Sequence, residues 1–291
     1  MKACFKSNPK IVKRALIVII TLFLAFSIVT VWGNVTLSVE KFNMEPEKIE
    51  IESGYKIAHI SDYHNTKNKK INEAVISSLK TEKPDIIVLT GDLVDRRKTD
   101  IQSGLDFVSE IIGVAPVYYV TGNHECNISI DSQSAFDNMI EDLEAFGVNV
   151  LRGERTEITL PHNEKINIFG IDDPYFHCGS SSEVADATDS LCSVFDVDKN
   201  EFNILLAHHP EHLDIYSKYN FDLVYSGHAH GGQGRLFGVG LIAPDQGLFP
   251  KYSSGLYEEN GTTLVVSRGI GNSIAPVRIF DRPHLIYTII E

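Results

Sequence analysis

The feature that most constrains how this chain folds is a series of short apolar runs, each followed directly by polar side chains. KIAHIS (56–61), IIVLT (86–90) and VYYVT (117–121) are typical of strands, as are the runs near 203–207 and 222–226. The polar residues after these five runs are Asp62 and His64, Asp92, Asn123 and His124, His208, and His228 and His230. In open α/β sheets the carboxyl ends of the strands form the ligand-binding edge, so we expect these side chains to lie together.

Helical stripes separate the first three runs and predict the fold class α/β. Apolar residues recur at helical spacing in 71–79, 101–112 and 136–146, with Gly147 placed to cap the last helix. Further strands are predicted near 148–151, 157–160, 166–171, 262–267 and 285–290, with a Ser/Asp-rich insertion at 172–200 and a Gly/Pro-rich loop at 231–256. We predict a two-layered β sandwich with helices on its outer faces, formed by one domain over residues 56–291.

The N-terminus contains an uncharged apolar segment, from Ala15 to Trp32, which reaches the lower length limit of a membrane-spanning helix. Lys13 and Arg14 precede it, so residues 1–14 are predicted to be a basic cytoplasmic leader and 15–32 a signal anchor. Residues 33–55 read as a tether and an edge strand. A cleavable signal peptide is the alternative, but its apolar region would be shorter and no A-x-A pattern follows. We therefore expect a single-pass protein of the cell membrane whose domain over residues 56–291 is extracytoplasmic.

The charge and the cysteine content limit the kinds of partner and metal site that this protein can have. The chain carries a formal net charge of -13. Because residues 1–32 contain five basic and no acidic residues, the remainder is more acidic still, which disfavours nucleic acid as a partner and suits a site that concentrates cations. Of the four cysteines, Cys178 and Cys192 are close enough in sequence to close a small loop, but no C-x-x-C motif indicates a cysteine zinc site.

The polar residues after the strands form a donor set for divalent cations. Asp62 and His64 are two residues apart, so an extended backbone can point both to one side. Asp92 can bridge two cations with its two oxygens, Asn123 offers an amide oxygen, and the imidazoles offer nitrogens. Mixed nitrogen and oxygen ligands without thiolate suit Mn, Fe or Zn. Two such ions can clamp a phosphoryl group.

The order of these motifs resembles that of the calcineurin-like metallophosphoesterases over about residues 55–291. Three stretches, GHAHGGQ, GLFPKYSSGLY and VVSRGIGNS, are similar to the membrane-associated branch that includes the YkuE and YaeI phosphodiesterases. The family motifs D-x-H, GD-x-x-D, GNHE, H and GHxH read here as Asp62-Tyr63-His64, Gly91-Asp92-Leu93-Val94-Asp95, Gly122-Asn123-His124-Glu125, His208 and Gly227-His228-Ala229-His230.

The resemblance implies a four-layer αββα sandwich and a phosphoester hydrolase with two divalent metal ions. His124 would stabilise the transition state or protonate the leaving oxygen. Tyr63 replaces the commoner leucine of the D-L-H motif, a change that bears on packing and access. By the same resemblance, one ion would be held by Asp62, His64, Asp92 and His230, and the other by Asp92, Asn123, His208 and His228.

Several neighbouring residues have two interpretations. His208 is preferred to His209 as a ligand because it fits the family pattern L-x-x-H-x-P. Asp95 is interpreted as a turn residue or a ligand's partner, and Glu125 either orients a neighbour or faces solvent. Arg268 and Asn272 contact a substrate phosphate or order the C-terminal loops.

The sequence thus predicts a membrane-anchored dinuclear phosphoesterase that cleaves a phosphodiester of a lipid or a nucleotide-sugar at the membrane face. One alternative is a phosphomonoesterase or phosphoprotein phosphatase. Another is a non-catalytic, membrane-tethered scaffold that keeps the metal site as a structural element. The insertion at 172–200 is expected to shape specificity. The oligomeric state stays open.

Overall fold

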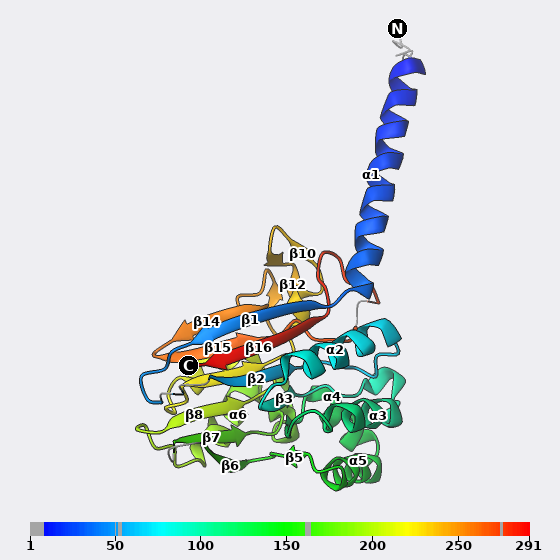
Figure 1. The fold of residues 1–291 in the computed structure, drawn as a ribbon. Helices are drawn as coiled ribbons and strands as arrows, with labels where there is room; N and C mark the ends of the chain where they lie inside the picture. Colours follow the sequence, from blue (N-terminus) through cyan, green and yellow to red (C-terminus); the bar gives the residue numbers. More distant parts are fainter. Residues whose placement is uncertain (1–8, 50, 52–53, 161–163, 274–275) are drawn as a thin grey trace.

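Two six-stranded sheets pack face to face, and helices cover their outer faces (Figure 1). This computed structural model describes residues 9–49, 51, 54–160, 164–273 and 276–291. The predicted leader, residues 1–14, therefore lies largely outside the described residues, as does Cys4. The four layers confirm the predicted αββα arrangement.

The first sheet has the order β1-β16-β2-β3-β4-β5. β2, β3, β4 and β5 are parallel neighbours, because α2 and α3 connect the first three as crossovers and α4 and α5 connect β4 to β5. Its strands are β1 (Ser38–Met44), β2 (Tyr55–Ile60), β3 (Ile86–Thr90), β4 (Val117–Val120), β5 (Asn149–Val150) and β16 (His284–Ile290). The helices of this half are α2 (Lys69–Glu82), α3 (Ile101–Ile111), α4 (Asn123–Asp131) and α5 (Gln133–Ala145).

The second sheet has the order β14-β15-β9-β8-β7-β6, with β7, β8, β9 and β15 mutually parallel and an antiparallel strand at each edge. Its strands are β6 (Glu154–Thr159), β7 (Lys165–Gly170), β8 (Phe202–Leu206), β9 (Leu223–Ser226), β14 (Gly255–Glu259) and β15 (Thr262–Val266). The helices on its outer face are α6 (Val184–Ser193) and α7 (Leu213–Tyr216).

The buried apolar residues form separate layers, because successive residues of a strand point to opposite faces of its sheet. In β8, Ile204 and Leu206 join the cluster between the sheets, whereas Leu205 joins the cluster under α6 and α7. In β2, Ile57 faces the other sheet and Ala58 faces α2. Three apolar layers therefore hold the four secondary-structure layers together and fix both sheets at the edge where the polar motifs lie.

Several elements were not predicted. α4 begins directly at Asn123, and α6 lies inside the segment interpreted as an irregular insertion. The predicted loop at 231–256 contains two small hairpins and the start of β14. These hairpins are β10 (Arg235–Leu236) with β11 (Val239–Gly240), and β12 (Ile242–Ala243) with β13 (Gly247–Leu248). Short 3-10 turns are η1 (Arg96–Lys98), η3 (Pro174–Phe176), η4 (Ser181–Glu183), η5 (Pro210–His212) and η6 (His230–Gly232).

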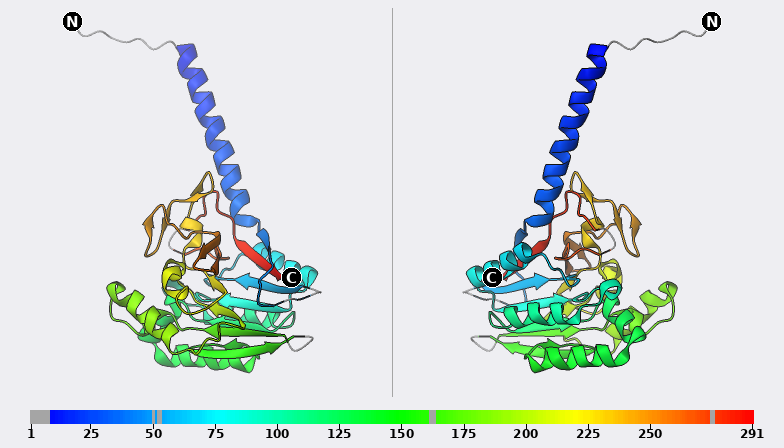
Figure 2. Two further views of the ribbon diagram at one scale, coloured as in Figure 1. Left: turned by 90° about the vertical axis from the view of Figure 1, so that its left-hand side faces the viewer. Right: turned by 90° about the vertical axis from the view of Figure 1, so that its right-hand side faces the viewer.

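The N-terminal helix α1 (Pro9–Val35) projects away from the domain, and its apolar side chains are exposed (Figures 1 and 2). Lys10–Val35 contains an 18-residue window with a mean hydropathy of 2.7, and the segment is long and apolar enough to cross a membrane. The helix extends beyond the predicted span 15–32 at both ends. The next strand, β1, pairs in parallel with β16, so the chain ends are joined in one sheet.

Cys126, Cys178 and Cys192 are free thiols in this structure. Cys192 packs in the apolar layer under α6, whereas Cys178 is partly exposed. The small loop between Cys178 and Cys192 is therefore not closed by a disulfide.

Candidate metal centre

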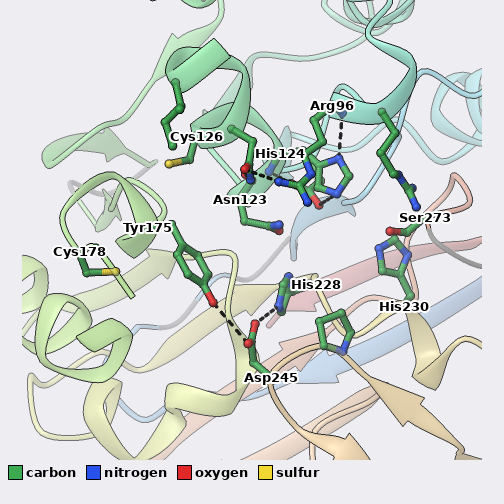
Figure 3. Close-up of a pocket in the computed structure, with 16 residues that line it drawn as sticks. Arg96, Asn123, His124, Cys126, Tyr175, Cys178, His228, His230, Asp245 and Ser273 are labelled. Atoms are coloured by element: carbon green, nitrogen blue, oxygen red, sulfur yellow. Dashed lines mark hydrogen bonds and ion pairs between the residues drawn. The ribbon is translucent and has the colours of Figure 1, made fainter. Parts of the chain in front are cut away.

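The predicted ligands meet where the carboxyl ends of the two sheets adjoin. Asp62, Asp92 and Asn123 follow β2, β3 and β4 of the first sheet, and His208 and His228 follow β8 and β9 of the second. Figure 3 shows Asn123, His124, His228 and His230 on the walls of the pocket that opens at this edge. The expected convergence of side chains from five strand ends is therefore confirmed.

The first group of side chains is Asp62, His64, Asp92 and His230, whose ligand atoms all lie within 4.8 Å of one another. The Nε2 atoms of His64 and His230 are 3.1 Å apart. His64 Nε2 is 3.5 Å from Asp92 Oδ2, and His230 Nε2 is 3.3 Å from Asp62 Oδ1. Two imidazole nitrogens that face each other beside two carboxylates fit a bound divalent cation.

The second group surrounds the same oxygen of Asp92. His208 Nε2 is 3.4 Å from Asp92 Oδ2 and 3.2 Å from His228 Nδ1. Within the described part of the chain, Asn123 Oδ1 is buried and has no hydrogen-bond partner. A buried amide oxygen without a partner is costly unless something else binds it, and a cation would do so.

Asp92 presents one oxygen to both groups. Oδ2 faces His64 and His208, whereas Oδ1 accepts a hydrogen bond of 2.9 Å from the His124 backbone N–H. The N-terminus of α4 thus binds Oδ1, and Oδ2 is the oxygen that faces a histidine of each group.

Five of the seven proposed ligands have a left-handed backbone, which is uncommon for residues other than glycine. Such strain is typical of functional sites, where the surrounding structure holds the conformation in place. The φ values are 50° for Asp62, 47° for His64, 53° for Asp92, 63° for His228 and 46° for His230.

Close backbone approach requires glycine beside two of the ligands. A Cβ on Gly227 would overlap Ser61 Oγ and Asp62 Oδ2, and a Cβ on Gly122 would overlap Asp92 Oδ1. The structure thus gives these glycines a steric reason, because they let carboxylates pack directly on the backbone of the neighbouring motif.

Burial and charge perturb the pKa values of the buried side chains. Burial raises the pKa of Asp62 and lowers that of His64 to about 3. Burial also raises the pKa of Asp92, but the charges of His124 and His208 outweigh it and hold that pKa well below its usual range. Burial lowers the pKa of His208, yet the negative charge of Asp92 raises it to about 10. The centre thus combines an ionised Asp92 with imidazoles that a cation can bind.

His124 lies beside both groups, with Nε2 3.9 Å from Asp92 Oδ2. Its Nδ1 accepts a hydrogen bond of 3.1 Å from the Arg96 backbone N–H and is 3.5 Å from Asp95 Oδ1. Asp95 also caps η1 by accepting from Arg97 N, so it is a turn residue and a neighbour of His124. Because Nδ1 accepts this hydrogen bond, Nε2 is the ring nitrogen that carries the proton.

Glu125 is fully buried and orients its neighbours, which decides between its two interpretations. One oxygen accepts from the backbone N–H groups of Asp92 (2.9 Å) and Gly122 (2.7 Å), and the other accepts from Val94 N–H (3.1 Å). Burial raises the pKa of Glu125 to about 8, while the three donors favour its ionised form. This carboxylate joins the loop after β3 to the start of α4.

Sequence reasoning missed Asp245 and the role of His209. Asp245 Oδ2 is 2.9 Å from His228 Nε2, which orients His228 with Nδ1 towards His208 (Figure 3). His209 is buried between Asp173 (2.9 Å) and Glu211 (2.7 Å). Asp245 lies in a turn that only the tertiary fold brings to the site, so no local signal in the sequence could have found it.

Arg268 and Asn272 differ in position. Arg268 Nη1 binds Glu40 Oε1 (3.1 Å) and Ser254 Oγ (3.2 Å), which favours the interpretation that Arg268 orders the C-terminal segments. Asn272 borders a small hollow beside His230 and accepts from Arg278 Nε at 3.0 Å. Its contact with substrate stays a prediction.

A pocket of about 440 Å³ opens over the centre. Besides the predicted ligands, its walls include Arg96, Arg97, Tyr175, Asp245 and Ser273 (Figure 3). Two guanidinium groups beside a candidate cation centre suit an anionic ligand such as a phosphate ester.

The fold and this centre define a class of protein, and the comparison with family models agrees. Residues 55–232 match the model of the calcineurin-like phosphoesterases. The chain belongs to this family, and it is a metal-dependent phosphoric ester hydrolase.

The relatives include YkuE and YaeI, the two proteins of the membrane-associated branch named above. The chain is 32% identical to an uncharacterized metallophosphoesterase of Aquifex aeolicus, over 88% of this chain and 92% of the relative. It is 28% identical to the uncharacterized metallophosphoesterase YkuE of Bacillus subtilis, over 81% and 79%. It is 26% identical to the phosphodiesterase YaeI of Escherichia coli, over 79% and 80%.

Proposed function

We propose that this protein uses two divalent cations to hydrolyse a phosphodiester of a lipid or a nucleotide-sugar at the membrane surface. The observation that carries the proposal is the position of Asp92 Oδ2, which faces a histidine of each ligand group at 3.5 and 3.4 Å. One cation belongs to Asp62, His64, Asp92 and His230, and the other to Asp92, Asn123, His208 and His228. Such ions are Mn, Fe or Zn, and when bound they polarise the phosphoryl group and acidify water.

His124 is proposed to stabilise the transition state as a hydrogen-bond donor. Because its Nδ1 accepts the Arg96 N–H, its Nε2 carries the proton beside Asp92 Oδ2. Because Nε2–H is then the single proton of the ring, it can donate a hydrogen bond to the charge that develops on the leaving oxygen as the ester bond breaks, and the proton stays on the imidazole. Arg96 and Arg97 on the pocket wall are placed to bind the remaining phosphate charge.

The membrane location follows from α1. The helix has Lys10, Lys13 and Arg14 at its N-terminal end, which favours a cytoplasmic N-terminus and an extracytoplasmic hydrolase domain over residues 56–291. Asn34 donates to Arg278 O (2.8 Å) and accepts from Arg278 N–H (2.9 Å). Cleavage after a signal peptide near Trp32 would remove the helix that holds Asn34, so these contacts support an uncleaved anchor.

The first test replaces His124 with Gln in the full-length protein loaded with Mn. Hydrolysis of bis-p-nitrophenyl phosphate is expected to fall about 100- to 1,000-fold while the metal content stays unchanged, because glutamine does not reproduce the position of the Nε2–H donor. The matched control is His177→Gln, which changes a half-exposed histidine outside the ligand set. Unchanged hydrolysis by the His124 variant would show that another group stabilises the developing charge.

The same assay separates the competing functions. A higher rate on p-nitrophenyl phosphate than on the diester would favour the phosphomonoesterase or phosphoprotein phosphatase alternative. Inactivity of the fully metallated protein on both esters would favour a scaffold whose metal site is structural. Lipid-linked and nucleotide-sugar diesters are then compared as substrates of the active protein.

A further inference from the structure

Large apolar side chains are exposed together on the two small hairpins and on the loop that precedes β16. We call this surface the apolar rim. Phe237 is 98% exposed, Leu248 73% and Phe249 68%. Among the residues that the structure describes, the exposed apolar residues of the rim are Leu236, Phe237, Val239, Leu241, Ile242, Leu248, Phe249, Val277, Ile279 and Phe280. An exposed apolar surface of this extent indicates an interaction site.

Backbone hydrogen bonds join the three parts of the rim. Arg235 N–H donates to Ile279 O at 2.9 Å, which attaches the first hairpin to the loop. Leu241 N–H donates to Gly234 O at 2.9 Å, and Phe249 N–H donates to Leu241 O at 2.9 Å, which attaches the second hairpin to the first. The rim is therefore one surface rather than three unrelated loops.

The rim lies at the end of the domain from which α1 projects (Figures 1 and 2). The rings of Phe280 and Phe26 pack edge to face with centroids 5.9 Å apart. Phe26 is six residues before Trp32, which is about 9 Å along a helix. Phe280 therefore lies beside the apolar part of α1, closer to the N-terminal end of this helix than Trp32 does. The Arg282 guanidinium covers the ring of Trp32 at 5.0 Å.

The same elements border the catalytic pocket. Pro244 and Asp245, in the turn of the second hairpin, line it, and so does Ser273 at the start of the loop. A neighbouring hollow is lined by Lys67, Arg97 and Lys98, although the domain as a whole is acidic. Apolar side chains next to basic ones match the acyl and phosphate layers of a membrane surface.

We propose that the apolar rim inserts into the membrane leaflet on the side of the catalytic domain, as a second membrane contact that turns the pocket towards the lipid headgroups. This inference rests on the proposed membrane anchor. The chosen occupant is the bilayer that holds α1, because the rim is continuous with that helix through Phe280 and Phe26. Interfacial insertion reaches about 5–10 Å, a depth that the position of Phe280 matches.

Tryptophan fluorescence in vesicles tests the proposal with the full-length chain. Trp32 is the sole tryptophan in the sequence, so Trp32→Phe provides a background for single-tryptophan variants. Phe237→Trp and Phe249→Trp probe the rim, and Phe23→Trp marks the span. Phe146→Trp is the matched aromatic control, since it lies after α5 at the opposite end of the domain (Figure 1). The proteins are reconstituted in phosphatidylcholine–phosphatidylglycerol vesicles with and without brominated acyl chains.

The expected result is a loss of emission at positions 237 and 249 that approaches the loss at position 23, with no loss at position 146. Quenching at 23 alone would overturn the proposal and leave the anchor intact. Quenching at none of the four positions would overturn the anchor as well. Blue-shifted but unquenched emission at 237 would mean that a protein surface, such as a second copy of this chain, covers the rim instead of lipid.

Discussion

At the scale of single residues, the centre depends on very close packing between motifs that are far apart in the sequence. Gly227 precedes His228, and its missing side chain leaves room for Ser61 and Asp62 from the first sheet. The backbone N–H of His228 then lies 3.1 Å from Asp62 Oδ1. A carboxylate of one sheet is thereby fixed by the backbone of the other, which places both sets of ligands.

Replacing Gly227 with Ala tests this packing. The added Cβ overlaps Ser61 Oγ and Asp62 Oδ2, so the free energy of unfolding should fall by about 1–3 kcal/mol, and cation affinity should weaken as Asp62 moves. Thermal unfolding and metal titration measure both effects. Gly113→Ala is the control, because its Cβ would come no closer than 3.9 Å to any neighbour. Equal stability of the two variants would refute the steric argument.

A pH dependence of cation binding follows from His208. Without a cation, Asp92 raises the pKa of His208 to about 10, so this imidazole is protonated near neutral pH. A cation must displace that proton. Affinity should therefore increase with pH, by about tenfold per pH unit for each proton released. Calorimetry in buffers of different ionisation enthalpy counts the protons, and binding without proton release would contradict this assignment.

At the scale of secondary-structure elements, α4 and the loop after β3 act as one unit. Glu125 lies at the third position of α4 and binds the backbone of Gly122, Asp92 and Val94. The N-terminus of α4 also donates the His124 N–H to Asp92 Oδ1. This helix end therefore directs Oδ2 towards both groups of histidines.

Glu125→Gln should disturb this unit. The amide keeps one acceptor oxygen but turns an NH₂ group towards backbone N–H donors, which costs about 1–3 kcal/mol of stability. We also expect weaker cation binding, because the Asp92 backbone loses its partner. Denaturant unfolding and metal titration give the two values, with Glu144→Gln on the exposed face of α5 as the control. Unchanged stability and cation affinity in this variant would show that Glu125 does not hold α4 and the loop after β3 together.

Strands and helices could be predicted from the sequence where the apolar periodicity is strong. Helices were missed where polar side chains obscure that periodicity. α4 contains His124, Glu125 and Cys126 as buried residues, so its buried face reads as polar. α6 buries Val184, Ala187, Thr188 and Cys192 at helical spacing, but its Ser/Asp-rich context concealed this pattern. The position of Asp245 could not be predicted because it depends on how the short hairpin of β12 and β13 folds over η6.

At the scale of the whole molecule, the apolar helix α1, the apolar rim and the pocket adjoin one another. The pairing of β1 with β16 brings the end of α1 beside the C-terminal loop, and Asn34 joins them through Arg278. Such pairing between distant chain ends cannot be predicted from local sequence. It gives the N-terminal helix a fixed base next to the catalytic pocket, which supports a substrate that arrives at the membrane surface.

The most direct test of the central claim is the rate of diester hydrolysis as a function of bound metal. Full-length protein is stripped with a chelator and titrated with Mn while bis-p-nitrophenyl phosphate hydrolysis is followed. The account predicts no hydrolysis by the stripped protein and a rate that reaches its plateau at about two metal equivalents per chain. A plateau at a single equivalent, or full activity after complete metal removal, would contradict it.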